Sequence, residues 1–266
     1  MTEIAFSKLH GAENDFLLTW VEDAAGITDL PEAARRICAR NTGIGGDGWM
    51  LVERTPSGLR TRLFNSDGSE AEISGNGTRC AAAFALLKGA ASGPDVTIVT
   101  GAGAKRLHLL EQHGRKFLFE MDMGEPHIEE LHTSLTLNAQ AFDATILNVG
   151  NPQCAIFVAE FPANWRELGR EAERHPRFPR GSNVSFVHVL DRHTLDVRFF
   201  ERGAGETRSS GTGTTGAAAA AILRDVCESP VEIRTPAGVL RLRWEGSIFL
   251  IGPVQLVGEG RFFLEL

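Results

Sequence analysis

The chain lacks the features that mark membrane, secreted and nucleic-acid-binding proteins. No apolar run approaches the roughly 20 residues that a membrane-spanning helix needs. Residues 1–10 contain no apolar signal-peptide core. Basic charge is also scarce: 27 lysines and arginines face 34 aspartates and glutamates, which gives a net charge of −7, whereas nucleic-acid-binding domains are more often basic. We therefore expect a protein that binds neither a membrane nor nucleic acid.

Cysteine is rare and widely spaced. Cys38, Cys80, Cys154 and Cys227 form no C-x-x-C pair. This usage is typical of a cytosolic protein with reduced thiols. We expect a small buried side chain at each of the four positions.

Ordinary composition excludes several other classes. Hydrophobic residues make up 42% of the 266 positions and charged residues 23%, close to globular averages, so the whole chain is not disordered, collagen-like or a coiled coil. The length suits one large domain or two of about 130 residues. Glycine, with 29 residues, exceeds its usual share of roughly 7%.

The two halves of the sequence resemble each other at an offset of 136 residues. Residues 45–86 align with residues 181–222, and within them Ser74-Gly-Asn-Gly-Thr78 aligns with Ser210-Gly-Thr-Gly-Thr214. The period is far too long for a solenoid. The repeat therefore predicts two similar domains related by a pseudo-twofold axis.

Local patterns predict the same elements in both halves. Met50–Val52 and Phe186–Val189 have the composition of short strands, and Leu195–Phe200 alternates as a half-buried strand does. The alanine-rich runs Cys80–Leu87 and Gly216–Leu223 predict buried helices, because alanine has the best helix propensity and neither run has a polar face. We expect an α/β (α+β) fold, in which each domain is a curled, mostly antiparallel sheet around one central helix.

Further strands are predicted in residues 88–135 and 228–266. Glycine and proline predict turns at Ser92–Pro94, Pro236–Gly238 and Ile251–Pro253. We expect the first domain to comprise residues 1–120 plus 256–266 and the second residues 121–255, with the active site in the cleft between them.

Each predicted helix begins at a glycine-rich turn. Glycine allows the backbone to approach a ligand, and the free N–H groups at a helix N-terminus attract anions. One such loop is a weak signal, since it is as readily a tight turn. Two loops facing one cleft would hold a carboxylate and stabilise a carbanion beside it.

Five segments carry a resemblance to a known family: Lys8–Phe16, Gly43–Gly48, Asn65–Cys80, Gly150–Cys154 and Glu201–Gly213. In order and spacing they resemble diaminopimelate epimerase. The resemblance implies two domains, each a curled sheet around a helix, and a homodimer. It also implies a cofactor-independent enzyme that interconverts LL- and meso-diaminopimelate in lysine and cell-wall synthesis, with one cysteine at each helix N-terminus acting as base or acid.

The resemblance also implies a set of substrate-binding residues. Six of them would grip the distal amino-acid end of the substrate: Asn14, Asn65, Asn151, Asn183, Glu201 and Arg202. The chemistry fits, since arginine pairs with a carboxylate, glutamate with an ammonium, and asparagine fills the remaining hydrogen bonds. The glycine-rich loops would add Gly75, Asn76, Gly211 and Thr212.

The chain departs from the family at the reacting groups. Ser74 and Ser210 stand where the family has its two cysteines. A cysteine has a pKa of about 8.5, whereas a serine needs an adjacent base to become reactive, and no such base can be identified from the spacing. Gln153 replaces a family histidine, and Glu13 stands where the family usually has glycine. His10 is expected to be structural rather than a base.

The sequence fits two explanations of these serines: replacement of both cysteines to trap an inactive enzyme, or natural divergence, which the changes at Gln153 and Glu13 favour. Three functions remain open. The first is a diaminopimelate epimerase or a close amino-acid isomerase. The second is an isomerase or lyase acting on another amino or dicarboxylic acid. The third is a non-catalytic binder of a diamino acid.

Overall fold

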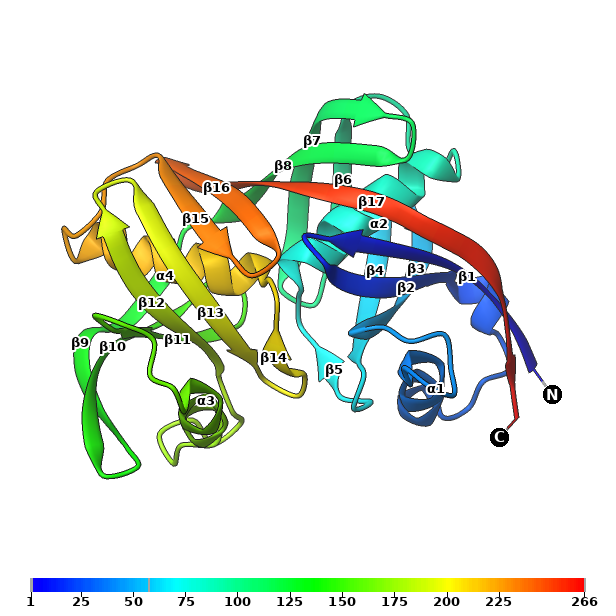
Figure 1. The fold of residues 1–266 in the computed structure, drawn as a ribbon. Coiled ribbons are helices and arrows are strands. Elements are labelled where there is room, and N and C mark those ends of the chain that lie inside the picture. The colour runs from blue at the N-terminus through cyan, green and yellow to red at the C-terminus, as the bar shows by residue number, and fades with distance from the viewer. Residues whose placement is uncertain (1, 57, 266) are drawn as a thin grey trace. The chain divides into compact units, whose positions relative to one another are not determined.

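The chain divides into two compact units. A computed structural model describes residues 2–56 and 58–265 (Figure 1). The first unit runs to Met121 and resumes at Gly252, and the second comprises Asp122–Ile251. The second unit is therefore inserted into the sequence of the first.

The first unit contains most of the N-terminal strands and three helices. Its strands are β1 (Thr2–Gly11), β2 (Asn14–Trp20), β3 (Gly48–Thr55), β4 (Gly58–Asn65), β5 (Glu70–Ala71), β6 (Asp95–Thr100), β7 (Gly103–His113) and most of β8 (Lys116–Gly124) and β17 (Ser247–Leu264). Its helices are the short 3₁₀ helix η1 (Val21–Ala24), α1 (Leu30–Cys38) and α2 (Gly75–Leu87).

The second unit repeats this order. Its strands are β9 (His127–Leu137), β10 (Gln140–Asn148), β11 (Pro152–Phe157), β12 (Asn183–Asp191), β13 (Thr194–Glu201), β14 (Gly205–Thr207), β15 (Val231–Thr235) and β16 (Gly238–Glu245), with the starting residues of β17. Its helices are α3 (Trp165–Glu173) and α4 (Gly211–Leu223).

Strand pairing confirms the predicted repeat. In the first unit β2 pairs parallel with β3 and β4 parallel with β6, and the chain between each pair contains α1 or α2. In the second unit β11 pairs parallel with β12 and β13 with β15, around α3 and α4 in the same way. The remaining pairs are antiparallel, as in β1–β2, β3–β4 and β12–β13. Each unit is thus the mostly antiparallel sheet that the sequence predicts.

A small-residue helix lies inside each sheet. Helix α2 packs on β1, β2 and β6, and α4 packs on strands from β10 to β16 of its own unit (Figure 1). The first eleven residues of each helix are buried, because alanine and glycine leave room for strands to approach from every side. Both helices begin at the loop glycines Gly75 and Gly211, earlier than predicted, because Ser74 and Ser210 act as N-caps. None of the helices in the described part of the chain is long and apolar enough to cross a membrane.

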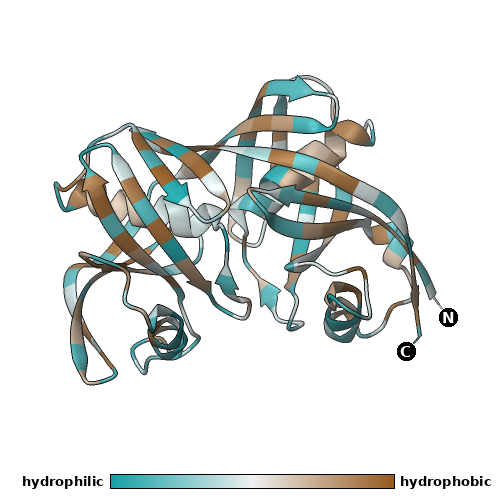
Figure 2. Ribbon diagram, viewed as in Figure 1, coloured by the Kyte–Doolittle hydropathy of each residue, from teal (hydrophilic) through white to brown (hydrophobic). Residues whose placement is uncertain are grey.

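The other two α-helices, α1 and α3, are amphipathic and cover the outside of the sheets. Helix α1 buries Ala33, Ala34 and Ile37 in a core with Trp49 and Phe64. Helix α3 buries Trp165, Leu168 and Ala172 in a core with strand residues of the second unit. Figure 2 shows the corresponding alternation of hydrophobic and hydrophilic residues along the strands.

The predicted turn at Ile251–Pro253 is wrong, because β17 runs unbroken through it. Strand β16 pairs with β17 up to Ile251, and β1 pairs with it from Gln255 onward. Pro253 lies outside the residues that pair with β16 and β1, and β17 pairs with β8 as well. The turns predicted at Ser92–Pro94 and Pro236–Gly238 are present.

Candidate active site

Ser74 caps helix α2 in the first unit. Its backbone is extended and its hydroxyl accepts a hydrogen bond of 3.1 Å from the Gly77 N–H. The hydroxyl of Thr78 donates to the Ser74 carbonyl at 2.7 Å. The serine and its loop are thus held in place by the first turn of the helix, as expected for an N-cap.

Ser210 caps helix α4 in the same geometry and has one more partner. Its hydroxyl accepts from the Gly213 N–H at 3.0 Å and donates to Glu201 Oε1 at 2.6 Å. Ser210 is 1% exposed. A hydroxyl that donates a short hydrogen bond to a carboxylate in such a site has the adjacent base that serine activation requires.

The base beside Ser210 results from the hairpin that precedes α4. Glu201 ends β13, and β14 turns the chain back so that Glu201 pairs with Gly205. In the equivalent β4–β5 hairpin of the first unit, Asn65 ends β4, and its amide donates to the Ser69 hydroxyl at 3.0 Å. The two halves therefore differ: Ser210 has a carboxylate partner, and the hydrogen bond recorded for the Ser74 hydroxyl is the one from Gly77.

Two predicted substrate-binding asparagines form a chain of hydrogen bonds beside the start of α2. Asn76 donates to Asn14 Oδ1 at 3.2 Å, and Asn14 donates to Asp47 Oδ2 at 2.7 Å. Both asparagines are buried. The chain of donors fixes the direction in which each amide points.

Asp47 belongs to a charged cluster beside this chain. Arg40 makes two hydrogen bonds to Asp15, at 2.9 and 2.7 Å, and one to Asp47 at 2.7 Å, while Lys8 lies 3.0 Å from Asp15. Burial and the Asp15 charge raise the pKa of Asp47. Burial also acts to raise the pKa of Asp15, but Arg40 and Lys8 outweigh it and lower that pKa. The cluster thus pins the Gly43–Gly48 loop to β2.

Arg79 is fully buried on α2. Its Nη2 donates to Asn76 Oδ1. Its Nε and Nη1 atoms are buried with no hydrogen-bond partner, and burial lowers the pKa of this guanidinium to about 10.

Amides also line the start of α4 in the second unit. Gln153 donates to Asn151 Oδ1 at 2.7 Å, and Asn151 donates to the Thr212 hydroxyl at 3.3 Å. Gln153 is 2% exposed and lies against Gly216, where an added Cβ would come within 3.1 Å of Gln153 Cγ. Gln153 thus orients Asn151, and an amide cannot serve as a base.

Asn183, the first residue of β12, lies beside Arg202, which follows the last residue of β13. Asn183 donates to the Pro152 carbonyl at 3.0 Å and accepts from the Arg202 N–H at 3.1 Å. This bond uses the backbone of Arg202, so its side-chain role as a carboxylate partner stays a prediction.

The structure thus brings most of the predicted residues together within each unit, with Asn65 held by Ser69 instead. Asn14 and Asn76 lie with the start of α2, and Asn65 ends β4. The second unit gathers Asn151, Asn183, Glu201, Arg202, Gly211 and Thr212 around the start of α4. Sequence reasoning missed Glu201 as the partner of Ser210 and missed Arg79 entirely. Without knowledge of the hairpin, a glutamate nine positions before a serine cannot be recognised as its partner. An arginine in an otherwise apolar helix, by contrast, can be recognised in the sequence as unusual.

Other candidates behave as structural groups. All four cysteines are buried, and burial raises the pKa of Cys38, Cys80 and Cys154 to about 12 and that of Cys227 to about 11. His10 Nδ1 accepts from the Glu13 N–H at 3.2 Å. Glu13 has a φ of 60°, in the left-handed region that favours the family's glycine.

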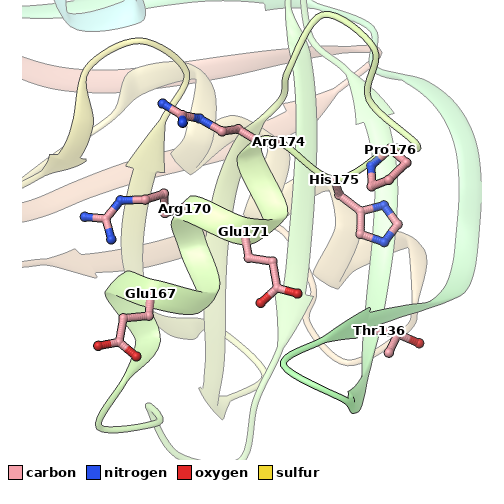
Figure 3. Close-up of a pocket in the computed structure, with 7 residues that line it drawn as sticks. All are labelled: Thr136, Glu167, Arg170, Glu171, Arg174, His175 and Pro176. Carbon is pink, nitrogen blue, oxygen red and sulfur yellow. The ribbon is translucent and has the colours of Figure 1, made fainter.

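No metal-ligand cluster is found among the described residues, and the hollow beside α3 lies apart from the predicted site. Among the described residues, no three His, Cys, Asp or Glu side chains gather as metal ligands would. A hollow of about 500 Å³ beside α3 is lined by Thr136, Glu167, Arg170, Glu171, Arg174, His175 and Pro176 (Figure 3). Glu171 there accepts from the Asn138 N–H at 3.0 Å and so caps a turn. This hollow contains none of the predicted site residues.

Sequence comparison places these motifs in a family. The pattern that defines diaminopimelate epimerase matches residues 6–129 and 145–257. A diaminopimelate epimerase of Moorella thermoacetica is 38% identical, covering 98% of this chain and 99% of the relative. One of Pseudomonas syringae pv. syringae is also 38% identical, covering 97% and 98%.

Solved structures share the fold at much lower identity. A hydroxyproline epimerase from Agrobacterium vitis superposes with a TM-score of 0.76 at 14% identity, covering 98% of this chain and 91% of that one. A phenazine biosynthesis protein of the PhzF family from Bacillus anthracis gives 0.71 at 14% identity, covering 99% and 100%. With the sequence match over nearly the full chain, the conclusion is that this protein belongs to the diaminopimelate epimerase family.

Proposed function

We propose that the protein is a cofactor-independent enzyme that moves the α-proton of an amino acid, with diaminopimelate as substrate. The observation that carries this proposal is the 2.6 Å hydrogen bond from Ser210 to Glu201 at the start of α4. It supplies a base to one of the two serines, which the sequence leaves without one.

The proton transfer would run through this pair. Ser210 Oγ takes the proton from the substrate α-carbon while its own proton passes to Glu201. The electron pair of the broken C–H bond stays on carbon and spreads into the adjacent carboxylate, which helix N-termini stabilise. Return of a proton to the opposite face inverts the centre, and Ser74 is the group proposed to deliver it.

The substrate class follows from the amides and charges around the two loops. We propose that the distal amino-acid end of the ligand is bound by Asn14, Asn65, Asn151, Asn183 and Arg202. Glu201 is then shared between the substrate and Ser210. We also propose a homodimer that acts in the cytosol.

A second candidate is an isomerase or lyase that works on one face of its substrate. The observation that favours it is the asymmetry of the half-sites: Asn65 stands at the position equivalent to Glu201. An unassisted serine is a poor acid and base, so a proton would be removed and returned at Ser210. The non-catalytic binder is the third candidate.

Deuterium exchange separates the three candidates. The protein is incubated in deuterated water with LL- and, separately, with meso-diaminopimelate, and the product is analysed for α-deuterium and configuration. An epimerase exchanges and inverts, a one-face enzyme exchanges without inversion, and a binder does neither while calorimetry shows binding.

Two variants test the Ser210–Glu201 pair in the same assay. Glu201→Gln keeps the side-chain shape but cannot accept the proton, so we expect exchange to fall by at least the 10²-fold that general-base catalysis contributes. Ser74→Ala is the comparison, because it removes the other cap hydroxyl and leaves the pair intact: exchange at Ser210 is expected to continue, while inversion is lost. Exchange that survives Glu201→Gln would contradict the assigned base.

A further inference from the structure

An isolated positive charge is buried in the first unit. Arg79 has no measurable exposure, and no carboxylate among the described residues forms an ion pair with it. Two of its three nitrogens have no hydrogen-bond partner. A buried charge is normally paired, so this one needs an explanation.

The guanidinium is directed at the start of its helix. Arg79 lies in the second turn of α2, and its Nη2 reaches back to Asn76, the second residue of the helix. Side chains in a helix lean toward its N-terminus, which makes this contact natural. Arg79 therefore adds its charge to the N-terminal end of the helix dipole.

The second unit has no such charge at the equivalent place. Thr215 occupies the position of Arg79 in the repeat, and its hydroxyl donates to the Gly211 carbonyl at 2.9 Å. The α4 end instead has the carboxylate of Glu201 beside its N-cap. The two helix ends thus differ in charge as well as in hydrogen bonding.

From these observations we infer that Arg79 makes the N-terminus of α2 the anion-binding end of the site, with the carboxylate of the ligand as its missing counter-ion. Arg79 acts through Asn76 and through its field, so it is a positioning residue. This inference rests on the proposed function for the identity of the ligand, but not for the presence of an anion site.

Stability provides the first test. Arg79→Met fills similar space without the charge, and replacing uncompensated buried charge by an apolar group is often neutral or stabilising. We expect the urea midpoint of Arg79→Met to equal or exceed that of wild type. Arg224→Met is the matched control, because buried Arg224 pairs with Asp143 and donates to the carbonyls of Leu131 and Ala144. Its midpoint is expected to fall.

Anion binding provides the second test. In thermal-shift titrations with inorganic phosphate, which needs only an anion site, and with meso-diaminopimelate, Arg79→Met is expected to bind at least tenfold more weakly than wild type. Arg79→Lys, which keeps the charge, is expected to recover part of the loss. Arg224→Met, measured where it is folded, is expected to bind as wild type does.

The outcomes distinguish this inference from the proposed function. A midpoint of Arg79→Met that falls as far as that of Arg224→Met, or equal phosphate affinity in wild type and Arg79→Met, would overturn the inference. Phosphate binding that depends on Arg79, together with no binding of diaminopimelate, would support the inference and reject the proposed substrate.

Discussion

At the residue scale, two serines occupy equivalent positions in the repeat and differ in their surroundings. The sequence alone predicts that both serines lie at helix N-termini. It also explains why each is less reactive than a cysteine in the same place. It does not predict the carboxylate beside Ser210, because Glu201 reaches it only through the β13–β14 hairpin. Side-chain partners of this kind depend on tertiary geometry, which one sequence does not contain.

Arg202 offers a test of recognition at a single residue. Arg202→Ala is expected to weaken diaminopimelate binding by about 1.5–3 kcal/mol, the range for hydrogen bonds to charged groups. L-Lysine lacks the distal carboxylate, so calorimetry is expected to show equal affinity for wild type and variant. An equal loss for both ligands would instead assign Arg202 a structural role.

Asp15 is expected to make the free energy of unfolding depend on pH. Because the folded protein lowers its pKa, its contacts stabilise above the ordinary value of 3.8 and are lost as the pH falls through the lower folded value. Asp15→Asn is expected to reduce the free energy of unfolding by about 2 kcal/mol at pH 6, with the difference from wild type shrinking in acid.

Urea denaturation at several pH values measures this effect. The control is Glu22→Gln, which breaks the exposed pair with Arg54, and we expect it to change stability by less than about 1 kcal/mol. A difference between wild type and Asp15→Asn that stays constant down to strong acid would show that the carboxylate charge is not what stabilises the cluster.

The cysteines give a chemical prediction. Thiolates, not thiols, react with iodoacetamide, and burial raises the pKa of Cys38, Cys80 and Cys154 to about 12. Mass spectrometry is expected to find no rapid alkylation of the native protein and full alkylation in denaturant. Rapid labelling of one native cysteine would place an accessible thiol where we find none.

At the element scale, the sequence predicts most of the architecture. The alanine runs, the alternating strands and the internal repeat give the central helices and the sheet around each one. The errors lie at boundaries. The helices begin earlier because the loop serines cap them, and β17 continues through Pro253 because it pairs in turn with β16, β8 and β1. Such boundaries depend on strand partners, which local patterns do not specify.

The first turns of α2 and α4 tolerate substitution differently. A Cβ at Gly213 would lie 2.8 Å from the Phe199 ring and 2.9 Å from Ser210 Oγ, whereas one at Gly77 would meet the terminal methyl of Met50 at 2.9 Å. A methionine end can move, and a buried ring cannot. Gly213→Ala is therefore expected to cost about 1–3 kcal/mol of stability and Gly77→Ala less, by urea denaturation. The reverse order would show that Phe199 can move aside.

At the scale of the whole molecule, the second unit is continuous in sequence and the first is not. Asp122–Ile251 alone is expected to unfold cooperatively in a thermal scan, because it contains its own sheet and helix. Residues 1–121 alone are expected not to, because β1 then lacks β17, its partner from Thr2 to His10. Cooperative unfolding of the shorter fragment would show that β17 is dispensable.

The late position of β17 also sets the order in which the chain can fold as it leaves the ribosome. Domains usually fold from the N-terminus as they are synthesised, but here the strand that completes the first unit is translated after the whole second unit. The second unit can finish folding while β1 still waits for its partner, so the first unit can mature only after the second has left the ribosome.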